Sequence, residues 1–186
     1  PGGPVSADIG VIGGRIANIG ALGGDAGEVI DCTGLHVLPG VIDSQVHFRE
    51  PGLEHKEDLE SGSRAAVMGG VTAVFEMPNT KPNTDTADRV ADKLARAHHR
   101  MWCDHAFYVG ATAENAEQLK ELERIPGTSG VKIFMGASTG SLLVDDDNAL
   151  ARVLASGTRR VAIHAEDETR MNARKDYRVE GDPSSH

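Results

Sequence analysis

Long apolar runs are absent from the sequence: none approaches the ~20 residues of a membrane span, and none forms a signal-peptide core. Positive charge is also scarce, because 19 Lys and Arg stand against 28 Asp and Glu, giving a formal net charge of -9. Nucleic acid and anionic membrane surfaces both attract basic proteins, so this balance argues against either as a partner. A small anionic substrate is compatible with the charge, since it needs only one or two local cations.

Cysteine is nearly absent, and the two present, Cys32 and Cys103, fit no metal-ligand spacing. We predict that both are small buried hydrophobic residues in a reducing compartment. The sequence opens on Pro1-Gly2-Gly3-Pro4 without an initiating methionine. Together these features predict a cytoplasmic protein whose first residues are missing or processed.

Residues 1–38 are predicted to form a small β-rich module ahead of the main domain. Short β-like runs alternate there with glycine pairs such as Gly13-Gly14 and Gly23-Gly24, which are typical turn signals. The predicted strands of this module lie at residues 8–12, 15–19, 28–30 and 35–38.

Residues 39–186 change to an α/β pattern, in which strands alternate with amphipathic helices and so indicate a parallel sheet with right-handed crossovers. One helix, for example, places Val90, Leu94 and Ala97 on a single apolar stripe. Five βα units are predicted, whereas a (β/α)8 barrel has eight and typically needs roughly 250 residues. The predicted strands are 41–47, 71–77, 103–109, 129–135 and 160–165, and the predicted helices are 56–68, 87–100, 113–124, 146–156 and 167–177.

Chemically capable side chains follow four of the five predicted strands. In parallel α/β folds the ligand site lies at the carboxyl ends of the strands, so these side chains should share one rim. Nitrogen and oxygen ligands of this kind suit zinc, with manganese or cobalt as alternatives. The first strand supplies His47 and Arg49, the second Asn79, the fourth Lys132 and the fifth His164.

Lys132 is unusual because it stands inside an apolar run, where an unpaired ammonium faces several kcal/mol of desolvation. Burial lowers the pKa of a lysine, and a neutral amine can combine with carbon dioxide to form a carbamate. The two oxygens of a carbamate could bridge two metal ions. Alternatively, the side chain points toward a helix and extends to solvent.

The other candidates also have structural alternatives. His164 could be a satisfied core histidine, and Asn79 could be a turn residue ahead of Lys81-Pro82. Arg49 could form a surface ion pair with Glu50 or Glu54. Its planar donor fork, two residues after His47, equally suits a substrate carboxylate.

Several motifs resemble those of dihydroorotases, which are members of the cyclic amidohydrolase superfamily, and the resemblance runs through essentially the whole chain. The Phe-Arg-Glu-Pro-Gly element and the asparagine after the second strand distinguish dihydroorotases from hydantoinases and allantoinases, which share the metal scaffold. The motifs that carry the resemblance span residues 38–43, 47–52, 77–80, 130–135 and 164–166.

The resemblance implies the amino-terminal part of a metal-dependent TIM-type barrel. It implies reversible hydrolysis of dihydroorotate to N-carbamoyl-aspartate in pyrimidine biosynthesis, with two zinc ions. His47, carboxylated Lys132 and His164 would be metal ligands, while Arg49 and Asn79 would bind the substrate carboxylate. A further histidine and a catalytic aspartate are expected on later strands, in a missing carboxyl-terminal half of the barrel, and the isolated segment is expected to be inactive.

Gln45 departs from the family pattern, because it stands where the first histidine of the usual His-x-His pair is expected. An amide oxygen is a weaker zinc ligand than imidazole. This favours a rival hypothesis, a non-catalytic dihydroorotase-like scaffold for aspartate carbamoyltransferase. A homodimer and a hydantoinase-type or allantoinase-type activity are further alternatives.

Overall fold

The computed structural model describes residues 3–136 and 142–185. The chain divides into two compact units, Pro1–Leu38 and Pro39–His186. Within the described ranges, no helix is both long enough and apolar enough to cross a membrane.

The first unit contains one antiparallel strand pair, β1 (Asp8–Ile12) with β2 (Arg15–Gly20). Gly13 and Gly14 form the turn between them with φ of 58° and 74°, the left-handed conformation that tight hairpin turns require and glycine adopts freely. The prediction of further strands at 28–30 and 35–38 is wrong. Neither run pairs with a neighbour within the described residues, so neither acquires ladder hydrogen bonds.

The second unit contains, in its described residues, a five-stranded parallel sheet in the order β3-β4-β5-β6-β7. All five predicted strands are confirmed, with no end shifted by more than one residue. Neighbours in the sheet are also neighbours in sequence, which is the topology of a barrel wall. The strands are β3 (Val41–Val46), β4 (Val71–Glu76), β5 (Asp104–Gly110), β6 (Thr128–Phe134) and β7 (Val161–His164).

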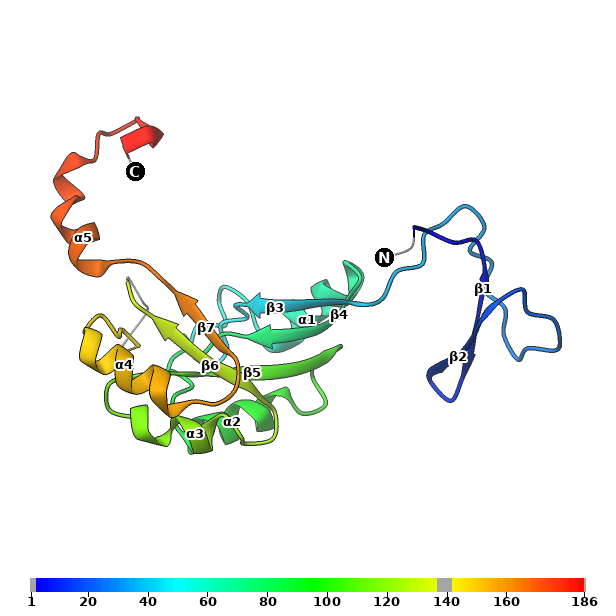
Figure 1. Cartoon of the computed structure of the whole chain (residues 1–186), viewed down its shortest axis with the longest axis horizontal. Helices are drawn as coiled ribbons and strands as arrows, with labels where there is room; N and C mark the ends of the chain where they lie inside the picture. The colour runs from blue at the N-terminus through cyan, green and yellow to red at the C-terminus, as the bar shows by residue number, and fades with distance from the viewer. Residues whose placement is uncertain (1–2, 137–141, 186) are drawn as a thin grey trace. The chain divides into compact units, whose positions relative to one another are not determined.

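Helices cover one face of this sheet (Figure 1). Side-chain caps fix several starts: Asp58 accepts from the Ser61 amide and Asp146 from the Ala149 amide. The predicted helix at 113–124 is shorter, because Asn115 closes a turn with Thr112 before it. The helices are α1 (Leu59–Met68), α2 (Ala87–Ala97), α3 (Leu119–Leu122), α4 (Asp147–Ser156) and α5 (Glu168–Ala173), with 3-10 turns η1 (Ala116–Gln118), η2 (Lys175–Tyr177) and η3 (Pro183–Ser185).

The core lies between the sheet and the helices. Alternate strand residues supply it, so that Val74, Val109, Val131 and Ile133 are all almost completely buried. Burying each such side chain contributes about 1.5–3 kcal/mol. The residues between them in each strand necessarily point to the opposite face of the sheet, and this is the face that carries the candidate site.

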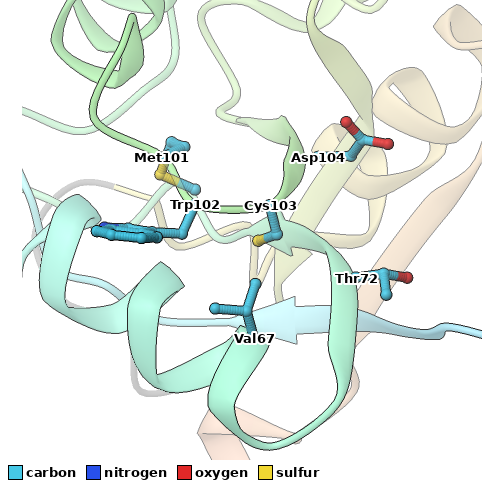
Figure 2. Close-up of a pocket in the computed structure, with 6 residues that line it drawn as sticks. All are labelled: Val67, Thr72, Met101, Trp102, Cys103 and Asp104. Carbon is cyan, nitrogen blue, oxygen red and sulfur yellow. The ribbon is translucent and has the colours of Figure 1, made fainter. Parts of the chain in front are cut away.

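The prediction of two buried cysteines is wrong. Cys32 is exposed in an extended segment of the first unit, and Cys103 is only partly buried. Cys103 lines an open pocket of about 430 Å³ beside the start of β5 (Figure 2). The pocket lies at the amino ends of β4 and β5, away from the carboxyl ends that carry the candidate residues, and is lined by Val67, Thr72, Met101, Trp102, Cys103 and Asp104.

Candidate metal and substrate site

His47 directly follows β3 and is half-buried. Its Nδ1 lies 2.9 Å from Oδ1 of Asn79, which can only accept, so Nδ1 carries the proton and donates it. Nε2 then presents its lone pair. Burial lowers the pKa of His47, and the Arg49 cation lowers it further. A neutral, oriented imidazole with an available Nε2 is the form that binds a metal ion.

Lys132 is buried, with 2% of its surface exposed. Its neighbours in β6, Val131 and Ile133, pack against the helices, so the lysine side chain lies on the opposite face of the sheet. The ammonium stands 4.8 Å from the centre of the Phe134 ring. Burial lowers the pKa of Lys132, while Glu166 opposes this shift. The structure therefore excludes the alternative in which Lys132 extends through the helix layer to solvent.

His164 ends β7 on the same face and contacts the ring of Phe134. Its Nε2 lies 2.9 Å from Oε1 of Glu166, which leaves Nδ1 as the other ring nitrogen. The second carboxylate oxygen of Glu166, Oε2, is buried and makes no hydrogen bond. Glu166 thus places a buried oxygen without a hydrogen bond next to His164, and its charge also acts on Lys132.

Charges on two of the other candidate residues act on His47. The charges of Lys132 and His164 both lower the pKa of His47, although the three residues belong to β6, β7 and the end of β3. No cluster of three or more His, Cys, Asp or Glu residues suited to a metal ion occurs in the part of the chain that the structure describes. The predicted nitrogen donors on this face are two imidazoles and the Lys132 amine, and the buried carboxylate oxygen of Glu166 adds negative charge near His164.

Arg49 has an unusual backbone conformation, with φ of 68°. A non-glycine residue in this region is strained and persists only where the surroundings hold it, a condition common at binding sites. Glu50 is not its ion-pair partner, because the Glu50 carboxylate receives two hydrogen bonds from Arg100 at 2.7 and 3.0 Å. Glu54 accepts from the Gly52 amide instead. Arg49 is thus not committed to either carboxylate proposed for it.

Gln45 lies in β3 two residues before His47, so both side chains point to the same face. Gln45 is exposed. It stands at the position where a second metal-binding imidazole was expected.

Sequence analysis missed two features of the site. Glu166 lies within the motif at residues 164–166, and its spacing of two residues from His164 is the signal that could have indicated a shared environment. The hydrogen bond between Asn79 and His47 joins residues 32 positions apart, and no sequence pattern identifies it.

The model of the Amidohydrolase family matches residues 36–178. The chain belongs to this family. The match covers the β3–β7 sheet, Lys132 and both candidate histidines. Members of the family are generally metal-dependent hydrolases.

Relatives of this amidohydrolase chain include more than one kind of enzyme. A dihydroorotase from Methanothermobacter thermautotrophicus is 37% identical over 185 residues, which cover 98% of this chain and 41% of that protein. A second dihydroorotase, from Methanosarcina mazei, is 41% identical over 159 residues, or 84% of this chain and 34% of that protein. An allantoinase from Deinococcus radiodurans is 36% identical over 172 residues, or 89% of this chain and 38% of that protein. The chain spans about a third to two fifths of the length of these relatives.

Solved structures with the same fold include hydantoinases. An L-hydantoinase from Arthrobacter aurescens superposes with a TM-score of 0.83 at 32% identity, covering 91% of this chain and 39% of that one. A D-hydantoinase from a Thermus species gives a TM-score of 0.76 at 31% identity, over 91% of this chain and 39% of that one. The amidohydrolase chain therefore has the fold of half a TIM-type barrel, preceded by a small β module, as predicted.

Proposed function

We propose that this amidohydrolase chain forms part of a dihydroorotase, which opens and closes the dihydroorotate ring at a zinc site. The observation that carries the proposal is the grouping of His47, Lys132 and His164 on one face of the sheet, with Arg49 beside them. Dihydroorotases among the relatives support this choice. Cytoplasmic pyrimidine biosynthesis is the corresponding cellular role.

In this proposal His47 through Nε2, His164 through Nδ1 and carboxylated Lys132 would hold the two zinc ions. When bound, zinc would lower the pKa of a water molecule so that it ionises near neutral pH, and zinc would also polarise the carbonyl of the ring amide. Asn79 keeps Nδ1 of His47 protonated and so keeps Nε2 aimed at the ion. Burial around Lys132 favours its neutral amine, the form that reacts with carbon dioxide.

Arg49 and Asn79 are proposed to bind the substrate carboxylate. The guanidinium of Arg49 offers two parallel donors, and the Asn79 side chain has an NH2 group in addition to the oxygen that faces His47. Arg49→Lys should lower kcat/KM for dihydroorotate on the order of tenfold or more, since lysine keeps the charge but loses the fork. Zinc content, measured by atomic emission, should stay constant; unchanged kinetics would remove Arg49 from the site.

Gln45 is proposed to weaken one of the two zinc positions. Gln45→His should raise zinc affinity at that position, because imidazole replaces an amide oxygen on the same face as His47. Calorimetric titration with zinc measures the affinity of each of the two zinc positions in the unmodified protein and in Gln45→His. Two equally tight zinc ions in the unmodified protein would show that another group already replaces the expected histidine.

The assay for the whole proposal uses a chimeric enzyme in which this chain replaces the aligned segment of the Methanothermobacter dihydroorotase. The zinc-loaded chimera should open dihydroorotate faster than allantoin or hydantoin, and the chain alone should turn over none of them. The second comparison is expected because the described strands leave the inner face of the sheet open to water. A folded, zinc-loaded chimera that prefers allantoin or hydantoin would contradict the dihydroorotase assignment.

Gln45 favours one rival function, a non-catalytic scaffold for aspartate carbamoyltransferase, because it replaces an expected metal-binding histidine. The rival predicts a folded chimera that binds little zinc, has no turnover and associates with the transferase in sedimentation experiments. Turnover that depends on Lys132 would exclude it.

A further inference from the structure

An ion pair is completely buried behind the candidate site. Lys93, from the middle of α2, pairs with Glu76, the last residue of β4, and both side chains are 0% exposed. Lys93 also stands 5.2 Å from the centre of the Phe107 ring. Burying two charges in an apolar layer costs several kcal/mol per ion, which their mutual attraction must offset. A layer built from the surrounding hydrophobic residues alone would avoid this cost, so the pair calls for another explanation.

The Glu76 end of the pair faces the segment that carries Arg49. Glu76 is the register partner of Val46 across the β3–β4 pair, so it lies beside the segment that leads to Phe48 and Arg49. The Phe48 and Arg49 amides favour its ionised form, although neither carboxylate oxygen makes a hydrogen bond of normal geometry. One residue beyond Glu76, the Met77 amide donates to the Val46 carbonyl at 2.9 Å. The end of β4 that carries Glu76 is therefore joined to the end of β3, three residues before the left-handed backbone at Arg49, where φ is 68° and the conformation needs external support.

The Lys93 end of the pair holds the loop that carries Asn79. Its ammonium donates to the Met77 carbonyl at 3.2 Å and to the Thr84 hydroxyl at 3.3 Å. These two acceptors flank the loop on either side of Asn79, and the Thr84 amide closes the loop by donating to the Pro78 carbonyl at 2.9 Å. Asn79 itself is 7% exposed and contacts His47.

We propose that the Lys93–Glu76 pair is a positioning device, which joins the backbone at Arg49 to the loop of Asn79 and so sets the spacing of the two carboxylate-binding side chains. One buried contact thereby positions both Arg49 and Asn79, the two residues proposed to bind the substrate carboxylate, which together are called the grip. Lys93 and Glu76 touch no substrate in this arrangement and act through Arg49 and Asn79. The identity of the bound carboxylate rests on the proposed function, whereas the positioning itself does not.

The test separates positioning from simple stabilisation. The double variant Glu76→Gln/Lys93→Met removes both charges and keeps similar volumes, a type of replacement that often leaves stability unchanged. Asp92→Asn is the matched control, since it breaks an exposed pair with Arg96 on the same helix. Amide signals of all three proteins are recorded by ¹⁵N NMR on the 186-residue chain, together with their melting temperatures.

The expected result is a folded double variant in which the Phe48, Arg49 and Asn79 amide signals move well beyond the changes in Asp92→Asn. If the double variant does not fold, Glu76→Gln alone gives the same comparison, because glutamine keeps the volume and one acceptor oxygen. Signals that match the Asp92→Asn control in a folded variant would overturn the proposal.

The second readout is kinetic and uses the chimeric enzyme. The double variant should raise KM for dihydroorotate on the order of tenfold at unchanged zinc content, since a displaced grip weakens carboxylate binding. If the amide signals of the double variant move but its KM for dihydroorotate is unchanged, the Lys93–Glu76 pair does not control carboxylate binding by Arg49 and Asn79. If the unmodified chimera fails to open dihydroorotate, the proposed function fails, and the NMR comparison still decides whether the pair positions Arg49 and Asn79.

Discussion

Lys132→Ala is expected to abolish zinc binding and ring opening together. Alanine removes the only buried amine on the site face that the structure describes, and with it the group proposed to bridge the ions after carboxylation. His47 and His164 then remain as two isolated imidazoles, which hold zinc weakly. Zinc content and dihydroorotate turnover of the chimeric enzyme measure both losses, and turnover should fall to the background of the metal-free protein.

Chemical rescue distinguishes a lost carbamate from a lost fold. Short carboxylic acids such as acetate or propionate fit the gap left by the lysine side chain and supply two oxygens, so they should restore part of the zinc content and activity of Lys132→Ala. Lys120→Ala, at an exposed position on α3, is the control and should change neither quantity. Full activity of Lys132→Ala without added acid would end the carbamate hypothesis.

Lys93→Ala should lower the free energy of unfolding of the second unit by about 3–5 kcal/mol, because it leaves the Glu76 carboxylate buried without its cation. For a chain of this size, that corresponds to a fall in Tm of roughly 2–4 °C per kcal/mol. Chemical denaturation followed by circular dichroism measures the change. Arg96→Ala removes an exposed partner of Asp92 on the same helix and should cost at most about 1 kcal/mol.

The Lys93→Ala deficit should also depend on pH. Burial raises the pKa of Glu76, and in this variant nothing from Lys93 opposes the shift. A carboxyl group whose folded pKa lies above its unfolded value stabilises the fold when protonated and loses that contribution as the pH rises. The deficit should therefore shrink on acidification toward the ordinary glutamate range. A deficit that is constant with pH would mean that Glu76 has the same pKa in the folded and unfolded variant, so that burial without Lys93 does not penalise its charged form.

Sequence periodicity was sufficient for the sheet, because each strand of the second unit is a short apolar run between turn signals. It failed for residues 28–30 and 35–38, which have the same local composition but no neighbouring strand to pair with. Strand formation depends on a partner that a local pattern cannot reveal. Cys103 was mispredicted for a similar reason, since its exposure is decided by the open pocket beside Trp102.

The site was predictable where topology alone brings residues together. His47, Lys132 and His164 follow from strand ends and the period of two. The support beneath them was not predictable: Lys93 is an ordinary polar position in an amphipathic helix pattern, and Glu76 ends an apolar strand. Only the packing of α2 on β4 makes them a pair. Charged residues that support a site are easily mistaken for surface residues when burial is unknown.

The order of strands in the sheet has a consequence for synthesis on the ribosome. Each strand pairs with the one made just before it, so the growing wall needs only short loop closures and never waits for a distant segment. Each helix can pack on the sheet as its βα unit leaves the ribosome. The two hydrophobic clusters and the Lys93–Glu76 pair can therefore form from residues that have already been translated. Pulse proteolysis of ribosome-bound chains should therefore show protection growing one βα unit at a time.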